Sequence, residues 1–287
     1  MRRVSIRIPV HAALESILMK VIPLLAAMIA SAALAAQEAP DEFQEDPTVH
    51  RAVVPVTGRV VGWAGIDWIG SVTLHNDSTE ELFVGLTMLT ANQPAIAFAV
   101  APGEVIDLDD VGGEILGTQG ILAPLLVNTL GSTPIRVSAR ATAVIEGRRL
   151  PPHNVPVISP DLGAGVLYLT GLVFSDSKRI NLGIENLGEE SAAVTVAVQL
   201  IEGRNIATAN FIVPPETLYH APIQTFFPLL TKAENITIVV DSPAGQIFAY
   251  ATVVDNGSHE ASFVSPRRIL RPSSSDQLQE TEDSLER

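Results

Sequence analysis

Three aspartates close together are the densest group of side chains that could do chemistry in this chain of 287 residues. Asp107, Asp109 and Asp110 offer carboxylate oxygens at alternating and adjacent positions, and Ca²⁺ prefers oxygen ligands of this kind. The spacing differs from that of an EF-hand, which needs a Gly at the sixth position and a Glu at the twelfth. Asp109 or Asp110 could equally cap a short helix by accepting from its free backbone N–H groups. Calcium binding and helix capping are therefore the two hypotheses for this cluster.

The only two tryptophans, Trp63 and Trp68, form a second candidate site. They lie beside Gly62, Gly65 and Gly70, in a segment that reads as a turn followed by a strand. Two aromatic rings on a loop at the rim of a sandwich could form a platform on which a sugar ring stacks. Alternatively, Trp68 closes the core at the start of its strand while Trp63 is half-buried in the turn. The pair thus predicts either a carbohydrate-binding module or a structural use.

The common catalytic and metal-binding motifs are absent from the sequence. The chain has no cysteine, which excludes thiolate metal sites, a cysteine nucleophile and disulfides. The histidines after the first 36 residues are far apart, so no zinc motif with two histidines on one helix face exists. No Gly-x-Ser-x-Gly turn occurs either. We expect no enzymatic activity and no cofactor; an enzyme with a site dispersed along the chain is the alternative from another class.

The N-terminal segment has the organisation of an export signal. Four basic residues precede an apolar and small-residue run over residues 21–36 that ends in Ala-Leu-Ala-Ala. This pattern predicts a helical signal peptide over residues 1–36, with cleavage near Ala36. The apolar run is shorter than the roughly 20 residues of a membrane span, so an uncleaved signal anchor is the second interpretation. A secreted or periplasmic protein of the cell envelope is expected.

The charge balance limits the possible partners. The chain has 18 Lys+Arg against 32 Asp+Glu, and a formal net charge of -14. Loss of residues 1–36 removes four basic residues and one acidic residue, which makes the net charge -17. Such an acidic surface favours solubility and repels nucleic acid and anionic lipid. We expect a protein or a polysaccharide of the cell envelope as the partner, no nucleic acid, and a membrane only through an uncleaved anchor.

Short strands separated by turn residues make up most of the remaining chain. The clearest cover residues 70–76, 83–89, 96–100 and 135–144, where side chains alternate or are β-branched. A hydrophobic content of 47% is too high for a disordered protein. Strands at intervals of roughly ten residues are typical of a β-sandwich. The sequence therefore predicts an all-β protein.

Landmarks of the first half recur in the second half. Leu74-His75-Asn76 aligns with Ile184-Glu185-Asn186, and Val100-Ala101-Pro102 aligns with Ile212-Val213-Pro214. A third match joins residues 140–144 to residues 250–254. Three landmarks in the same order indicate two copies of one unit of about 100 residues, a size typical of a sandwich.

Together with the predicted signal peptide over residues 1–36, this repeat divides the chain into five parts. Two β-sandwich units are expected at residues 52–158 and 160–268. An acidic linker over residues 37–51 precedes them, and a disordered polar tail over residues 269–287 follows. In each unit a longer connection predicts a short helical turn, one after Asp110 and the other within residues 222–230.

The sequence also resembles a family of secreted bacterial Ig-like repeats. Residues 62–76 resemble its pattern G-x-x-G-x-x-W-x-x-x-L-x-L-x-N, and residues 176–186 and 250–256 are similar to its second-repeat signature. The resemblance covers about residues 55–266. It implies two tandem Ig-like β-sandwich domains, no catalytic residues, and an unknown role in an exported protein that works beside proteases or adhesins.

Overall fold

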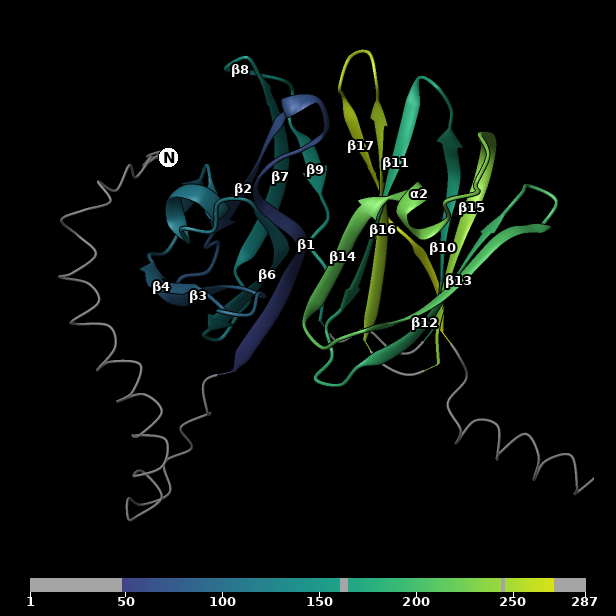
Figure 1. Ribbon diagram of the computed structural model, residues 1–287. Coiled ribbons are helices and arrows are strands. Elements are labelled where there is room, and N and C mark those ends of the chain that lie inside the picture. The colour runs from purple at the N-terminus through teal and green to yellow at the C-terminus, as the bar shows by residue number, and fades with distance from the viewer. Residues whose placement is uncertain (1–47, 161–164, 244–245, 271–287) are drawn as a thin grey trace, which may run out of the picture.

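A computed structural model describes residues 48–160, 165–243 and 246–270, which form an all-β protein (Figure 1). The predicted signal peptide, most of the acidic linker and nearly all of the polar tail lie outside the described residues. The strands of the first half are β1 (Val49–Val61), β2 (Asp67–His75), β3 (Leu82–Met88), β4 (Ala95–Val100), β5 (Val105–Leu108), β6 (Ile121–Leu130), β7 (Arg136–Ile145), β8 (Arg148–Arg149) and β9 (His153–Val155). Those of the second half are β10 (Gly165–Phe174), β11 (Lys178–Asn186), β12 (Ala192–Gln199), β13 (Asn205–Val213), β14 (Thr217–Pro222), β15 (Ala233–Ser242), β16 (Ile247–Asp255), β17 (Ala261–Val264) and β18 (Arg267–Leu270).

Strands β1 to β9 form the first sandwich. They follow the order β4-β3-β6-β1-β2-β7-β8, with β5 paired to β2 and β9 paired to β7. β1 pairs with β6 along most of its length but with β2 only at Val60 and Val61, so the sheet folds over into two layers. Alternating residues of both layers, such as Leu74 and Val84, are buried in one core. The residues between them in sequence, such as Thr73, therefore face outward.

Strands β10 to β18 form the second sandwich from two separate sheets. One has the order β13-β12-β15-β10-β18 and the other the order β14-β11-β16-β17. Leu182 of the second sheet and Ile238 of the first belong to one buried core. The succession β13-β12-β15-β10 corresponds to β4-β3-β6-β1 in the first sandwich, so the two halves share this part of their topology.

A buried asparagine occupies the same place in each sandwich. The Asn76 amide donates to the carbonyl oxygens of Glu80 (2.7 Å) and Val100 (2.8 Å). The Asn186 amide donates to those of Glu190 (2.7 Å) and Val213 (3.0 Å). These bonds match Val100 with Val213, whereas the sequence alignment matched it with Ile212. The alignment is therefore wrong by one residue along this strand, which matters because one residue exchanges the two faces of a strand.

Two short helical turns lie where the sequence predicts them. The turn η2 (Val111–Ile115) follows Asp110, and the turn α2 (Ile223–Phe226) lies within the predicted connection of the second half. A third turn, η1 (Trp63–Gly65), precedes β2. Among the described residues, no helix has the length and apolar character needed to cross a membrane.

Two predicted boundaries are wrong by a few residues. β1 begins at Val49, inside the predicted linker, because Val49 pairs with Leu130 of β6. β18 extends to Leu270, inside the predicted tail, because Leu270 pairs with Gly165 of β10. Both extensions depend on pairing with a strand far away in sequence, so the composition of the terminal residues does not reveal them.

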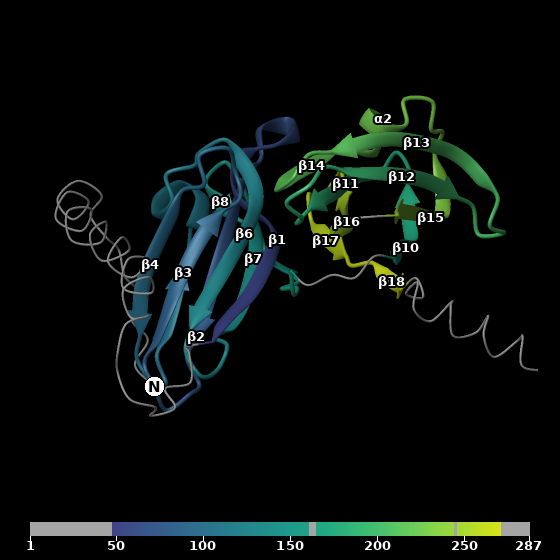
Figure 2. The same cartoon turned by 90° about the horizontal axis from the view of Figure 1, so that it is seen from below.

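The two sandwiches pack side by side (Figures 1 and 2). β14 contacts β6, and β17 contacts β9. The ring of Phe263, from β17, packs against the core of the first sandwich and stacks on Tyr250, with 4.7 Å between ring centroids. Gln93 also donates to the Glu216 carboxylate at 2.6 Å across this interface. The outer face of the β14-β11-β16-β17 sheet is thus covered by the first sandwich.

Candidate ligand-binding track

A row of polar side chains covers the outer face of β2 and β7 in the first sandwich. Val72 and Leu74 of β2 and Ala139 of β7 are buried in the core, so the alternate residues point away from it. These include Thr73 of β2 and Arg140 of β7, which lie near one another because Thr73 pairs with Ser138 of β7. This sheet face therefore presents hydroxyl and guanidinium groups in place of an apolar surface.

A hollow of about 460 Å³ lies over this polar face. At its floor, Arg140 Nη2 donates to Thr73 Oγ1 at 3.2 Å, and Thr73 Oγ1 donates to Asp107 Oδ1 at 2.7 Å. The hollow is lined by Ser71, Val72, Thr73, Asp107, Leu108, Asp109, Arg140, Thr142, Arg149, Leu150 and Pro152. Charges of both signs and several hydroxyls thus face one open depression.

A second hollow, of about 610 Å³, continues from the first toward the junction of the sandwiches. Arg149 and Leu150 line both hollows, so the two are contiguous. The second is lined by the β7–β8 hairpin of the first sandwich and by the turn after β16 of the second, which contributes His259 and Glu260. We call the two hollows together the polar track.

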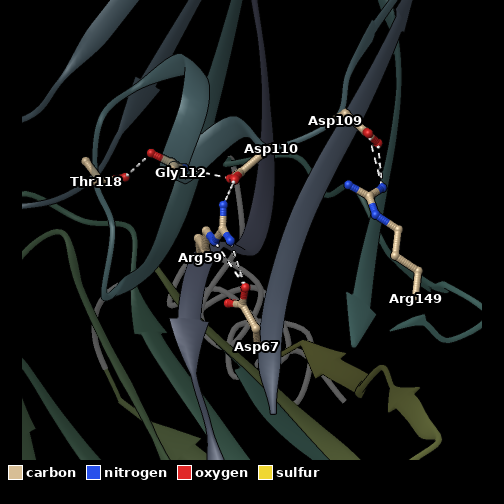
Figure 3. Close-up of polar contacts among 8 residues, drawn as sticks. Arg59, Asp67, Asp109, Asp110, Gly112, Thr118 and Arg149 are labelled. Atoms are coloured by element: carbon tan, nitrogen blue, oxygen red, sulfur yellow. Dashed lines mark hydrogen bonds and ion pairs between the residues drawn. The ribbon is translucent and has the colours of Figure 1, made fainter. Parts of the chain in front are cut away.

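The three predicted aspartates do not act together. Figure 3 shows Asp109 and Asp110 in separate contacts. Asp107 lies on the floor of the polar track, and Asp109 lies at its rim, paired with Arg149 at 3.1 Å. Asp110 is buried, and its Oδ1 accepts from the Gly113 backbone N–H at 2.7 Å as the cap of η2. Capping by Asp110 is thereby confirmed.

Arg59 holds the other oxygen of Asp110. Its guanidinium donates to Asp110 Oδ2 at 2.9 Å and to Asp67 Oδ2 at 2.9 Å (Figure 3). Hydrogen bonds to Asp67 and then to Asp110 raise the pKa of Arg59. Within the described part of the chain, no three acidic or histidine side chains gather as metal ligands. Calcium binding by Asp107, Asp109 and Asp110 stays a prediction that this arrangement does not favour.

The two tryptophans make different contacts and belong to different elements. Trp63 lies in η1 and is 61% exposed, with the Arg179 guanidinium of the second sandwich 4.9 Å from its ring centroid. Trp68 lies in β2 and is half-buried, in an edge-to-face contact with the His153 ring at 5.7 Å between ring centroids. Burial lowers the pKa of His153. Neither ring lines the polar track, and the geometry gives each tryptophan a structural contact.

The equivalent face of the second sandwich is covered by the first sandwich. Tyr250, which corresponds to Arg140 in the sequence alignment, is fully buried and lies over Gly183, where a Cβ atom would be 2.1 Å from the ring. His220 Nδ1 and the Tyr250 hydroxyl are 2.9 Å apart. Burial lowers the pKa of His220 to about 4.

A carboxylate is enclosed in the same covered face. Glu185 is fully buried, and neither of its oxygens has a hydrogen-bond partner among the described residues. Burial raises the pKa of Glu185 well above its usual range. The pKa of Tyr250 is also raised, mainly by burial and to a lesser extent by the charge of the nearby Glu185. A titratable group with a strongly shifted pKa in a pocket would favour the hypothesis of an enzyme with a dispersed site. Glu185 lines neither hollow of the polar track, so it gives that alternative no support.

No family model and no curated protein sequence matches the chain. Among solved structures, Thermotoga maritima 1070 is similar at 14% identity, over 39% of this chain and 98% of its own, with a TM-score of 0.32. Bacteroides uniformis β-glucuronidase 2, bound covalently to cyclophellitol-6-carboxylate aziridine, is similar at 10% identity, over 71% of this chain and 26% of its own, with a TM-score of 0.16. These scores carry no conclusion about function, and the resemblance to secreted Ig-like repeats stays an expectation.

Sequence reasoning finds only the acidic part of the polar track. Asp107 and Asp109 stand out because they are only two residues apart in sequence, whereas Thr73, Arg140 and Arg149 are ordinary residues on separate strands. One usable signal is that polar residues occupy alternate positions along both strands. These residues are Ser71, Thr73 and His75 along β2, and Ser138, Arg140 and Thr142 along β7. Two polar rows on neighbouring strands would have marked this sheet face as a solvent-facing surface.

Proposed function

We propose that this chain is an exported, non-catalytic binding module of the bacterial cell envelope or of the space outside the cell, and that its ligand lies along the polar track. The polar track is the observation that supports this proposal. The face that the second sandwich uses to pack against its neighbour is, in the first sandwich, open and lined with charged and hydroxyl groups. The packed sandwiches hold that face in a fixed orientation, which suits a binding or spacing role.

The shape and chemistry of the polar track favour a segment of polypeptide as the ligand. Two contiguous shallow hollows suit an extended chain, whereas small molecules bind in enclosed, mostly apolar cavities. Arg140 and Arg149 can donate to backbone carbonyls or acidic side chains, and Asp109 can accept from backbone N–H groups. The lining residues include no tryptophan, tyrosine or phenylalanine on which a sugar ring could stack.

Selection of random peptides on the immobilised chain tests this function. Peptides that bind in the polar track should lose affinity on the order of tenfold with Arg140→Ala, which removes a charged donor. Arg136→Ala is the matched control, because Arg136 is on the same strand but pairs with Asp77 outside the polar track. Selected peptides that bind equally to wild type and Arg140→Ala would contradict the assignment of the ligand to this face.

Carbohydrate binding is the second candidate, and the exposure of Trp63 favours it. With 61% of the residue exposed, the ring still has a surface on which a sugar could stack, although Arg179 lies near it. Isothermal titration against bacterial and plant polysaccharides, with Trp63→Ala as control, measures this directly. Heat of binding that is lost in Trp63→Ala but kept in Arg140→Ala would replace the peptide proposal with this one.

A further inference from the structure

Strand β4 has one bare side. Its backbone pairs with β3 from Ala95 opposite Thr87 to Val100 opposite Leu82, and no other described strand pairs with it. The backbone N–H and C=O groups on its other side can therefore pair with a further strand. Figures 1 and 2 place β4 at the end of the first sandwich that lies away from the second.

The hairpin that contains β4 lacks the charged residues that two other edge strands carry. Residues 82–103 include no charged side chain, although Glu81 and Glu104 stand on either side of them. By contrast, the edge strand β8 consists of two arginines, and the edge strand β18 begins with two more. Charged residues on edge strands prevent one sheet from pairing with another, so β4 is an edge without this protection.

The outer surface beside this edge is small and apolar. Ala95, Ala97 and Ala99 of β4 are exposed, while Ile96 and Phe98 between them pack on the core. A row of neighbouring side chains continues from Ala99 across the sheet and comprises Ala99, Phe83, Leu130 and Val49. Phe83 and Val49 in this row are each 53% exposed. The surface is therefore flat along β4 and apolar next to it.

We infer that β4 pairs with β4 of a second copy of this chain, antiparallel, to form a two-fold dimer with one continuous sheet. The alanines let the two strands approach without steric obstruction, and a two-fold axis at Ala97 places Ala95 opposite Ala99. The net charge of -14 makes copies repel one another elsewhere, and the uncharged hairpin is where their approach costs least. This interface is separate from the polar track, so the two proposals can fail independently.

The corresponding edge strand of the second sandwich, β13, suits such pairing less well. It also pairs with only one strand, β12, among the described residues. Its exposed positions include Thr208 and Asn210, and the Tyr219 hydroxyl donates to the Ile212 carbonyl oxygen at 3.4 Å. β13 differs from β4 because its surface is polar and one of its backbone carbonyls already accepts a hydrogen bond. β13 therefore supplies a matched control.

Sedimentation velocity of the purified chain over a range of concentrations tests the dimer. Wild type should dimerise, and Ala97→Lys should be monomeric, because it places a charge at the centre of the new interface. Thr208→Lys puts the same side chain on an exposed edge position of β13 and should leave the dimer intact. Melting curves establish that both variants fold. A wild type that is monomeric at every concentration, or a dimer that survives Ala97→Lys, would overturn the inference.

Cysteine cross-linking tests the strand pairing without adding a charge. The natural chain has no cysteine, so Ala97→Cys introduces the only thiol. In an antiparallel dimer centred on Ala97, the two thiols face one another at a spacing that a disulfide can bridge, and a mild copper oxidant should link most of the protein. Thr208→Cys should stay uncross-linked under the same conditions. Equal cross-linking of both variants would show random collision and contradict the paired edge.

Discussion

Asn76 shows how one side chain can hold the end of a strand. Its fully buried amide donates to two carbonyl oxygens, and its Oδ1 accepts from the Ser78 backbone N–H at 3.0 Å. Asn76→Ala leaves these buried groups unpaired and should lower the free energy of unfolding by about 2–4 kcal/mol in a urea titration. Asp77→Ala is the neighbouring control and should change it by less than about 1 kcal/mol, because the Asp77–Arg136 ion pair is exposed. Similar losses for both variants would contradict a special role for Asn76.

The buried Glu185 carboxylate should make the stability of the fold depend on pH. Burial raises its pKa in the folded state, so the folded protein keeps a proton that the unfolded chain releases above about pH 4.5. The contribution of Glu185 to the free energy of unfolding is therefore complete below that pH and is lost as the pH rises. Glu185→Gln cannot ionise, so its melting temperature should exceed that of wild type by on the order of 2–5 °C at pH 8 and by little at pH 4. A difference that is independent of pH would contradict ionisation as the cause.

The buried His220 should change the stability of the fold with pH in the opposite direction. Because burial lowers its pKa to about 4, the unfolded chain binds a proton below about pH 6.5 that the folded protein accepts only near pH 4. Its contribution to stability is therefore lost as the pH falls through this range. Wild type should be most stable between about pH 4.5 and pH 6.5, where the two effects offset one another. Comparing the melting temperatures of His220→Gln and Glu185→Gln across pH 4–8 separates the contributions of the two residues.

At the scale of elements, the turn η2 depends on Asp110 and not on its neighbour. Asp110 caps the turn and holds Arg59, so Asp110→Ala should lower the free energy of unfolding by about 1–3 kcal/mol. Asp109→Ala should be nearly neutral, because Asp109 and Arg149 form an exposed pair. Melting with Ca²⁺ and with chelator should give the same values. Stabilisation of wild type by Ca²⁺ that disappears in Asp109→Ala would instead support the calcium hypothesis.

Local patterns predict the elements, whereas the track depends on long-range pairing. The all-β class and the four strands expected at residues 70–76, 83–89, 96–100 and 135–144 are confirmed within a few residues, because alternation and turn residues are local signals. The ends of β1 and β18 depend on partner strands, and composition could not supply them. Arg140 and Arg149 reach one hollow only because β7 turns back into β8 beside Asp109. No spacing in the sequence reveals that arrangement.

At the scale of the whole molecule, the covered sheet face is where the two sandwiches pack against one another. Glu185 and Tyr250 are buried on the outer side of their sheet, where a solvated strand would carry polar, exposed residues. The cover comes from the first sandwich, through the contacts of β6 with β14 and of β9 with β17. Burying a carboxylate without a partner is unfavourable, so apolar contacts such as that of Phe263 must outweigh its cost.

Phe263→Ala should therefore separate the unfolding of the two sandwiches. The variant loses the ring that stacks on Tyr250 and packs against the first core, at a cost of about 2–4 kcal/mol to the docked state. Wild type should melt in one cooperative transition and Phe263→Ala in two. Tryptophan fluorescence follows the first sandwich, because both tryptophans belong to it. Phe83→Ala, which truncates an exposed phenylalanine of β3, is the matched control and should keep the single transition. Two transitions in wild type itself would mean that the sandwiches are independent, and the polar track would then have no fixed second half.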